Sequence, residues 1–201
     1  MVKKKILIVE GNTREENSEF TAVGINTHTE SLIESINFYK KDLDISIANP
    51  SSDNNLKNSI DSLDKYDGMI WGGSSLNIYN DTDEIRRQIS FMRECQLKIK
   101  KIFAICWGLQ VAVTVAGGQV KKSDKGAHRG IAHNIKVNNI GSNHKIYLDK
   151  KRQFNSPAFN FDEVVKIPEG ATLLSSNELN NVMGLNFKTN KSDIWLSLIH
   201  I

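Results

Sequence analysis

The chain has 201 residues, enough for one domain with a substantial hydrophobic core. Hydrophobic residues make up 39% and charged residues 24%, and the net charge of +3 comes from lysines that are scattered along the sequence. This composition argues against a nucleic-acid-binding surface, and no apolar run is long enough for a signal peptide or a membrane span. We therefore expect a cytoplasmic protein with no nucleic-acid or membrane partner.

Strands and helices alternate four times in the first half of the chain. Apolar runs predict strands, apolar residues at helical spacing predict helices, and the polar segment 11–26 predicts irregular structure. The expected strands cover residues 6–9, 43–48, 66–71 and 102–105, and the expected helices cover 29–41, 56–63, 83–94 and a segment from residue 107. This order predicts a doubly wound α/β fold, a mostly parallel sheet with helices on both faces.

The second half has a different pattern, with short strands separated by turns. These strands are expected at residues 131–137, 145–148, 171–175 and 182–187. They predict a small antiparallel portion packed beside the parallel core. Because no linker or internal repeat is visible, we interpret residues 1–201 as a single domain.

Cys106 lies between the predicted strand 102–105 and an apolar helix that ends at Gly117-Gly118. A residue on such a sharp strand-to-helix turn projects over the carboxyl edge of the sheet, the geometry called a nucleophile elbow. The amino end of the helix would favour a thiolate there. The alternative is a small core residue, because free cysteines are often buried.

A second strand end supports the catalytic interpretation. Gly72-Gly73 ends the predicted strand 66–71, and sites in parallel sheets form beyond the carboxyl ends of the strands. Both strand ends would therefore meet at one crevice. Taken alone, the glycine pair is better explained as an ordinary turn that ends the strand.

The other candidate residues have structural interpretations. Cys95 is expected to be a partly exposed structural thiol, and Trp71 and Trp195 to be core residues at strand ends. Neither cysteine has zinc-ligand spacing, so we expect no metal and no cofactor. Four histidines lie in polar or turn contexts and have no assigned role: His28, His128, His133 and His144.

In this order, the Gly72-Gly73 loop, Cys106-Trp-Gly-Leu-Gln110, Gly117-Gly118 and Asp162-Glu-Val-Val-Lys-Ile-Pro-Glu-Gly resemble a class I glutamine amidotransferase. The similarity is greatest to the glutaminase domain of GMP synthase and runs from about residue 60 to the end. It implies a flavodoxin-like fold and glutamine as the substrate.

The resemblance also implies a role for each matching residue. Cys106 would attack the side-chain amide of glutamine, forming a γ-glutamyl thioester and releasing ammonia. Backbone N–H groups of the Gly73 region and of Trp107 would stabilise the oxyanion. Gln110 would help to hold the glutamine.

Three positions depart from the family pattern. Ala104 replaces a glycine, and Asn160-Phe-Asp162 replaces a His-x-Asp motif. The family continues its last strand with Gly-Val-Gln-aromatic-His-Pro-Glu, whereas here Trp195 is followed by Leu-Ser-Leu-Ile-His-Ile. His200 falls in register with the catalytic histidine, and the carboxylate that would orient it is missing. One frame of a common transposase sequencing adapter encodes this ending, so a further hypothesis is that residues 196–201 are an artefact; under that hypothesis the register match of His200 would be accidental.

Two further interpretations remain open. A γ-glutamyl peptide hydrolase would use the same thioester, and a binding or regulatory module could keep the fold without catalysis. For the glutaminase interpretation, the ammonia would pass to an unidentified acceptor, such as a separate synthase protein.

Overall fold

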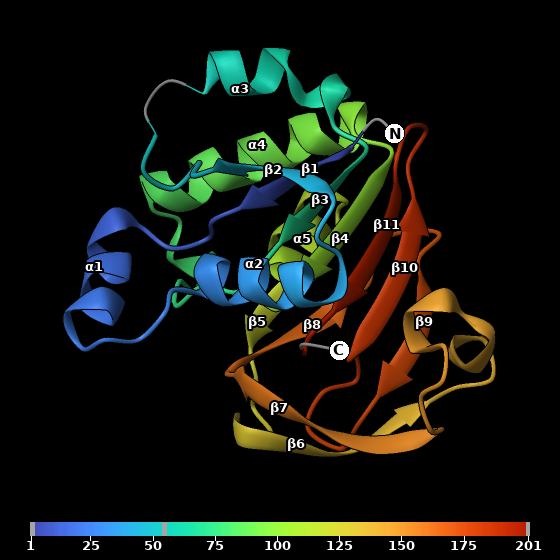
Figure 1. Cartoon of the computed structure of the whole chain (residues 1–201). Helices are drawn as coiled ribbons and strands as arrows, with labels where there is room; N and C mark the ends of the chain where they lie inside the picture. Colours follow the sequence, from blue (N-terminus) through green and yellow to red (C-terminus); the bar gives the residue numbers. More distant parts are fainter. Residues whose placement is uncertain (1–2, 54–55, 200–201) are drawn as a thin grey trace.

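The computed structural model describes residues 3–53 and 56–199 (Figure 1). Within these residues, one large sheet has nine strands in the order β2-β1-β3-β4-β11-β10-β9-β6-β7. Five strands run parallel: β1 (Lys4–Val9), β2 (Leu43–Ala48), β3 (Gly68–Trp71), β4 (Lys101–Ile105) and β11 (Asp193–Ser197). The fold is therefore the expected doubly wound, mostly parallel α/β architecture.

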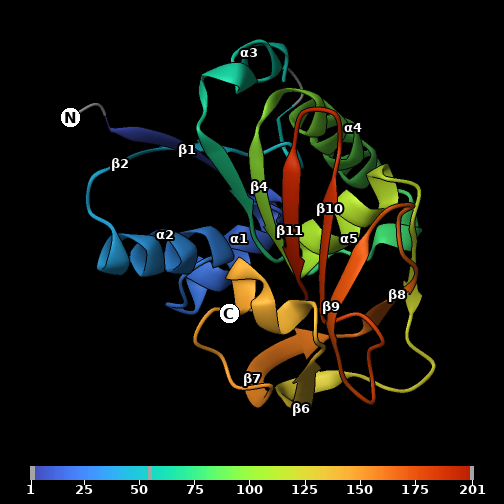
Figure 2. The ribbon, with the colours of Figure 1, turned by 90° about the vertical axis from the view of Figure 1, so that its right-hand side faces the viewer.

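The remaining strands are antiparallel. In the large sheet these are β10 (Gly184–Lys188), β9 (Thr172–Ser176), β6 (His128–Val137) and β7 (Gln153–Asn160). A separate small antiparallel sheet pairs β5 (Gln119–Lys122) with β8 (Asp162–Lys166). Figure 2 shows β6 and β7 crossing beneath the ends of β4 and β11, where they form a wall over the carboxyl edge of the parallel strands.

Helices cover both faces of the parallel strands (Figures 1 and 2). α2 (His28–Tyr39) lies on one face, and α4 (Asp83–Lys98) and α5 (Trp107–Val115) pack together on the other. α1 (Arg14–Ala22) and α3 (Lys57–Asp61) lie at the periphery. Short 3₁₀ turns occur at η1 (Leu63–Lys65), η2 (Ile78–Asn80), η3 (Gly141–Asn143) and η4 (Lys145–Tyr147).

The expectation of irregular structure over residues 11–26 was wrong, because α1 occupies part of this segment. Thr13 and Glu16 form a capping box, in which each side chain accepts a hydrogen bond from the other's backbone N–H. None of the residues of α1 is buried. The helix therefore lacks the apolar periodicity on which the prediction relied, and the capping box was the available signal.

Segment 145–148, expected as a strand, is instead the 3₁₀ turn η4 followed by exposed Leu148. Strands β5, β7, β8 and β11 were not predicted as strands. Several of these strands have one solvent-facing side and polar residues between the apolar ones, so their apolar runs are interrupted.

The hydrophobic core lies between the parallel strands and the layer formed by α4 and α5. Trp71, Trp107 and Phe91 are its largest fully buried side chains. Cys95 is completely buried, which corrects the expectation of a partly exposed thiol. Trp71 is confirmed as a core residue, whereas Trp195 is only half-buried because its side chain lies on the opposite face of the sheet from Leu196 and Ile194. Among the described residues, none of the helices combines the length and the apolar character needed to cross a bilayer.

Candidate active site

Cys106 lies at the turn between β4 and α5. Its backbone has φ of 53° and ψ of −103°, a conformation that residues with a side chain rarely adopt. Its N–H donates to the carbonyl oxygen of Ser197 at 2.8 Å, and its own carbonyl accepts from the N–H of Gln110 at 3.2 Å. Bonds to β11 and to the first turn of α5 thus hold the strained residue on both sides. This is the nucleophile-elbow geometry expected from the sequence.

Gly108 lets α5 approach the end of β3. Its N–H donates to the carbonyl oxygen of Gly72 at 3.1 Å. A Cβ added at Gly108 would lie 2.6 Å from the carbonyl oxygen of Trp71, which is too close for any side chain. This contact brings the Gly72-Gly73 backbone next to the elbow. Gly108 belongs to the sequence motif around Cys106, but its packing requirement becomes visible only in the structure.

The glycine pair itself is not sterically required. A Cβ at Gly72 would meet Leu32 at 3.9 Å, and one at Gly73 would meet His28 at 3.8 Å, both ordinary contacts. Gly73 nevertheless borders the same cavity as Cys106. Its backbone is therefore available to a molecule bound there, which is the property that the oxyanion hypothesis needs.

The Cys106 side chain is half-buried and faces a cavity of about 560 Å³. This volume is within the usual range of small-molecule sites, ~300–1,000 Å³. The thiol makes a weak hydrogen bond to the carbonyl oxygen of Phe159 on β7, at 3.9 Å. The walls of the cavity come from residues 73–77, 157–162 and 198–199. Phe20 of α1 and His28 of α2 also line it.

The Trp107 side chain does not line this cavity. It is buried in the core, and its indole Nε1 donates to Gln88. Only the backbone N–H of Trp107 faces the thiol, where it acts to lower the pKa of Cys106. The expected oxyanion residues Gly73 and Trp107 would thus contribute through their backbones.

Burial raises the pKa of the Cys106 thiol to about 11, the hydrogen bond from the Trp107 N–H opposes this rise, and the negative charge of Asp162 adds to it. This corrects the expectation that the helix terminus would favour the thiolate. Burial outweighs the helix terminus in setting the pKa of this thiol, so the protonated form is favoured at neutral pH.

Asp162 and Gln110 are buried on the cavity wall, at 4% exposure each. Asp162 Oδ1 and Gln110 Oε1 have no hydrogen-bond partner among the described residues. Burial raises the pKa of Asp162, and hydrogen bonding with the side chains of Tyr79 and Gln110 acts in the opposite direction. No lysine or arginine of the described residues lines the cavity. The cavity wall therefore has two acceptor oxygens without a described partner, and the charge of Lys122, which does not line the cavity, also acts on Asp162.

In the sequence, Asp162 is only one residue of the Asp162-Glu-Val-Val motif, and no site role was predicted for it. Its position is fixed through its carbonyl oxygen, which accepts hydrogen bonds from Asn160 Nδ2 at 2.5 Å and from Asn180 Nδ2 at 3.0 Å. Asn180 is distant in sequence, so no local pattern could have indicated this arrangement. The available signal was an acidic residue directly preceding a buried Glu-Val strand.

The histidines differ in whether they line the cavity that Cys106 faces. His200, the expected catalytic histidine, lies outside the described residues. His28 lines the cavity and makes an edge-on contact with Phe20, with ring centroids 5.4 Å apart. His128 is buried beside Asn177 and does not line the cavity. Over the described part of the chain, no three His, Cys, Asp or Glu side chains are close enough together to hold a metal ion.

The fold and the elbow define a class of protein, and the sequence agrees with it. The model of the family "Glutamine amidotransferase class-I" matches residues 25–194, so the chain belongs to that family.

The relatives include proteins with two related activities. The chain is 29% identical over 201 residues to a γ-glutamyl-L-1-hydroxyisopropylamide hydrolase from Pseudomonas sp., covering 97% of this chain and 66% of the relative. It is 27% identical over 120 residues to a glutamine-hydrolysing GMP synthase subunit from Sulfolobus acidocaldarius, covering 60% of each. The chain thus spans less than two thirds of the length of either relative.

The structural comparison concerns the fold. A glutamine amidotransferase from Thermotoga maritima superposes with a TM-score of 0.73 at 16% identity, covering 100% of this chain and 76% of that one. The flavodoxin-like, class I glutamine amidotransferase architecture expected from the sequence is therefore confirmed.

Proposed function

We propose that this chain hydrolyses γ-glutamyl amides through Cys106. One observation carries the proposal: a strained thiol faces a cavity on whose wall two buried acceptor oxygens, of Asp162 and Gln110, have no partner in the described chain. The thiolate attacks the γ-carbonyl carbon, the amine leaves, and a γ-glutamyl thioester forms that water then hydrolyses.

In this proposal, Asp162 and Gln110 hold the α-ammonium group of the γ-glutamyl substrate. An ammonium has three donors and a positive charge, so it would pair with both partnerless oxygens and with the negative charge of Asp162. Leaving these groups buried and unpaired is costly, so a ligand that pairs them gains affinity. Recognition would thus depend on the free α-amino group of the substrate.

Substrate binding would also activate the nucleophile. The Asp162 charge contributes to the raised pKa of Cys106. Pairing of that charge with the substrate ammonium removes this contribution, so the thiol ionises more readily when the substrate is bound. The thiolate would therefore form chiefly in the presence of its target.

The remaining roles follow the family resemblance. The N–H groups of Gly73 and Trp107 would stabilise the oxyanion of the tetrahedral intermediate. His200 would accept the thiol proton and return it to the leaving amine. This assignment rests on the sequence register alone.

The cavity favours a leaving amine larger than ammonia. Five large apolar side chains are among the residues that line it: Phe20, Phe159, Phe161, Leu198 and Ile199. A γ-glutamyl amide of an apolar amine would bury its leaving group there. The hydrolase relative from Pseudomonas sp. has a name of this kind.

Glutamine is the second candidate substrate, supported by the similarity to the GMP synthase protein from Sulfolobus acidocaldarius. The ammonia released from glutamine would then pass to a synthase protein or another acceptor. The exposed rings of Phe159 and Phe161 beside the cavity would be available for such a partner.

The test compares glutamate release from γ-glutamyl-isopropylamide, glutamine and α-glutamyl-isopropylamide. We expect turnover of the γ-glutamyl compounds only, and a loss of about a thousandfold or more in Cys106→Ser. In Asp162→Asn we expect KM to rise by about tenfold or more, because the ammonium loses its charged partner. Equal turnover of the α-isomer, or activity that survives in Cys106→Ser, would contradict the proposal. An inactive wild-type protein that binds none of these compounds would favour the non-catalytic module.

A further inference from the structure

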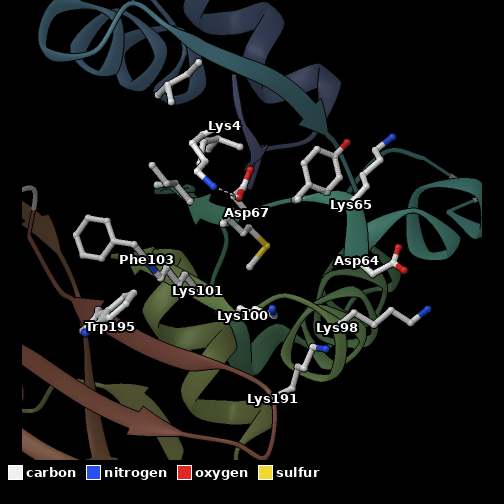
Figure 3. A pocket seen from close by; sticks show the side chains of 16 residues that line it. Lys4, Asp64, Lys65, Asp67, Lys98, Lys100, Lys101, Phe103, Lys191 and Trp195 are labelled. Atoms are coloured by element: carbon white, nitrogen blue, oxygen red, sulfur yellow. Dashed lines mark hydrogen bonds and ion pairs between the residues drawn. The ribbon is translucent and has the colours of Figure 1, made fainter. Parts of the chain in front are cut away.

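A second cavity, of about 690 Å³, lies at the amino edge of the same sheet (Figure 3). It borders the first residues of β1, β3 and β4, namely Lys4, Gly68 and Lys101. Cys106 follows the opposite end of β4, so the two cavities open at opposite edges of the sheet. Nothing in the proposed amide hydrolysis uses this second cavity.

The second cavity is strongly basic. Its lining holds two aspartates, Asp64 and Asp67, against six lysines: Lys4, Lys65, Lys98, Lys100, Lys101 and Lys191. The lining thus carries a net charge of +4, whereas the whole chain carries +3. The rest of the chain is slightly acidic, and the lysines that are scattered in sequence gather here in the fold.

The backbone under four of these lysines is rigid. Lys98, Lys100 and Lys101 surround the turn from α4 to β4, and Lys191 lies in the turn from β10 to β11. Two hydroxyls of the second turn donate to the carbonyl oxygen of Gln96 in the last turn of α4: Thr189 Oγ1 at 3.1 Å and Ser192 Oγ at 2.9 Å. The like charges are therefore held near one another by fixed turns.

Four of the six lysines form no ion pair with a described residue, and one of these four, Lys65, lies 5.1 Å from the centroid of the Tyr66 ring. Lys4 pairs with Asp67 at 2.7 Å, and Lys98 lies 3.6 Å from Glu94. Lys100, Lys101 and Lys191 make no side-chain hydrogen bond or ion pair with any residue that the structure describes. Because like charges repel at short range, a bound anion would relieve their repulsion.

Two aromatic rings line the same cavity. Phe103 on β4 and Trp195 on β11 are Cα partners in adjacent parallel strands, and both are half-buried. Figure 3 shows them together at one end of the cavity, with Lys101 beside them. Aromatic faces next to lysines suit a planar ring that carries phosphates.

We propose that this cavity binds a nucleoside polyphosphate. The phosphates lie among Lys100, Lys101 and Lys191, and the base lies against Phe103 and Trp195. The lysines supply charge, as point contacts to phosphate oxygens, and the rings supply stacking surface. The site is independent of Cys106, so it provides a way for a nucleotide to act on the protein away from the hydrolytic cavity.

Fluorescence titration of the full chain tests the proposal, because Trp195 is half-buried whereas Trp71 and Trp107 are fully buried. We expect ATP to quench the emission with saturation below about 1 mM. Tripolyphosphate should bind about fivefold or more weakly than ATP, because it lacks the base that stacks on the rings. Adenosine should hardly bind at all, because it lacks the phosphates that contact the lysines.

The triple variant Lys100→Gln/Lys101→Gln/Lys191→Gln should weaken ATP binding by about tenfold or more. Its matched control is Lys136→Gln/Lys145→Gln/Lys151→Gln, which removes the same charge from exposed positions outside the cavity and should change binding by less than about twofold. Trp195→Phe should remove the quenching while calorimetry still detects ATP.

Four results would overturn the proposal: no saturable ATP binding, equal weakening in both triple variants, equal affinity for ATP and tripolyphosphate, or tighter lysine-dependent binding of polyglutamate than of ATP. The last result would identify the surface as a docking site for an acidic polypeptide.

Discussion

Gln88 and Trp107 form a buried hydrogen bond, with the indole Nε1 of Trp107 donating to Gln88 Oε1 at 2.7 Å. The same Gln88 amide donates through Nε2 to the carbonyl oxygen of Gly11 at 3.0 Å. One side chain of α4 thus links the residue after the nucleophile to the loop after β1. The backbone N–H of Trp107 faces the thiol, so its position depends on this anchor.

Replacing Gln88 by leucine should destabilise the protein by about 1–3 kcal/mol, because the Trp107 indole and the Gly11 carbonyl lose their buried partner. Urea denaturation measures this change. The control is Gln153→Leu, which removes an exposed hydrogen bond to Asn134 and should cost less than about 0.5 kcal/mol. Equal losses in the two variants would show that the buried link does not contribute.

Gly108→Ala should destabilise the protein, whereas Gly72→Ala should leave its stability nearly unchanged. The added methyl group at Gly108 would lie 2.6 Å from the Trp71 carbonyl oxygen, so the elbow must shift, at a cost of about 1–3 kcal/mol. At Gly72 the nearest atom is 3.9 Å away, so stability should change by less than about 0.5 kcal/mol. Thermal unfolding of both variants gives the comparison, and a Gly108→Ala protein as stable as Gly72→Ala would refute this packing account.

Asp162 should make the protein less stable as the pH rises. Its pKa is raised in the folded state from an ordinary value of 3.8, so the folded protein holds this proton more tightly than the unfolded chain. The free energy of unfolding therefore falls as the pH rises from 3.8 through the folded pKa. Asparagine does not titrate, so the stability of Asp162→Asn relative to wild type should increase as the pH rises from 3.8 through the folded pKa of Asp162.

The control for this pH series is Asp81→Asn. Arg86 lowers the pKa of Asp81 through a hydrogen bond and its charge, so this carboxylate stabilises the fold increasingly as the pH rises through its titration. Because the folded pKa of Asp81 lies below 3.8, Asp81→Asn should lose stability relative to wild type only as the pH rises toward 3.8, and its relative stability should stay level at higher pH, where Asp162→Asn gains stability. Urea denaturation across the pH series measures both profiles, and a gain in Asp81→Asn above pH 3.8 equal to that in Asp162→Asn would contradict the assignment.

Cys106 should react slowly with iodoacetamide at neutral pH. With its pKa raised to about 11, the thiolate fraction and the alkylation rate should rise about tenfold per pH unit and show no plateau near the ordinary value of 9.0. Asp162→Asn should react faster, because it removes a charge that raises this pKa. Peptide mapping by mass spectrometry should find Cys95 unmodified in the folded protein, since its side chain is completely buried.

Those elements that carry a strong periodic signal could be predicted from the sequence. The strands 6–9, 43–48, 66–71 and 102–105 correspond to β1, β2, β3 and β4. Apolar runs indicated β1, β3 and β4, whereas β2 lies at the edge of the sheet and was indicated by its alternation of apolar and polar residues. Exposed elements such as α1 lack that signal, since no tertiary contact constrains their composition. The turn at η4 was taken for a strand because Ile146 and Leu148 alternate with polar residues, a spacing that an irregular turn can also have.

The sequence by itself determined the order of the layers and the elbow at Cys106, because both depend on local patterns: apolar runs, helix stops and one residue between a strand and a helix. The tertiary structure alone decided the chemical state of the site. Burial sets the raised pKa of Cys106, and chain crossings bring Asp162 and Gln110 to the same cavity wall. It also gathered the lysines, because the turns at Lys100 and Lys191 are adjacent in space although about 90 residues separate them in sequence. Burial and proximity are properties of the whole packed chain, and no local pattern encodes them.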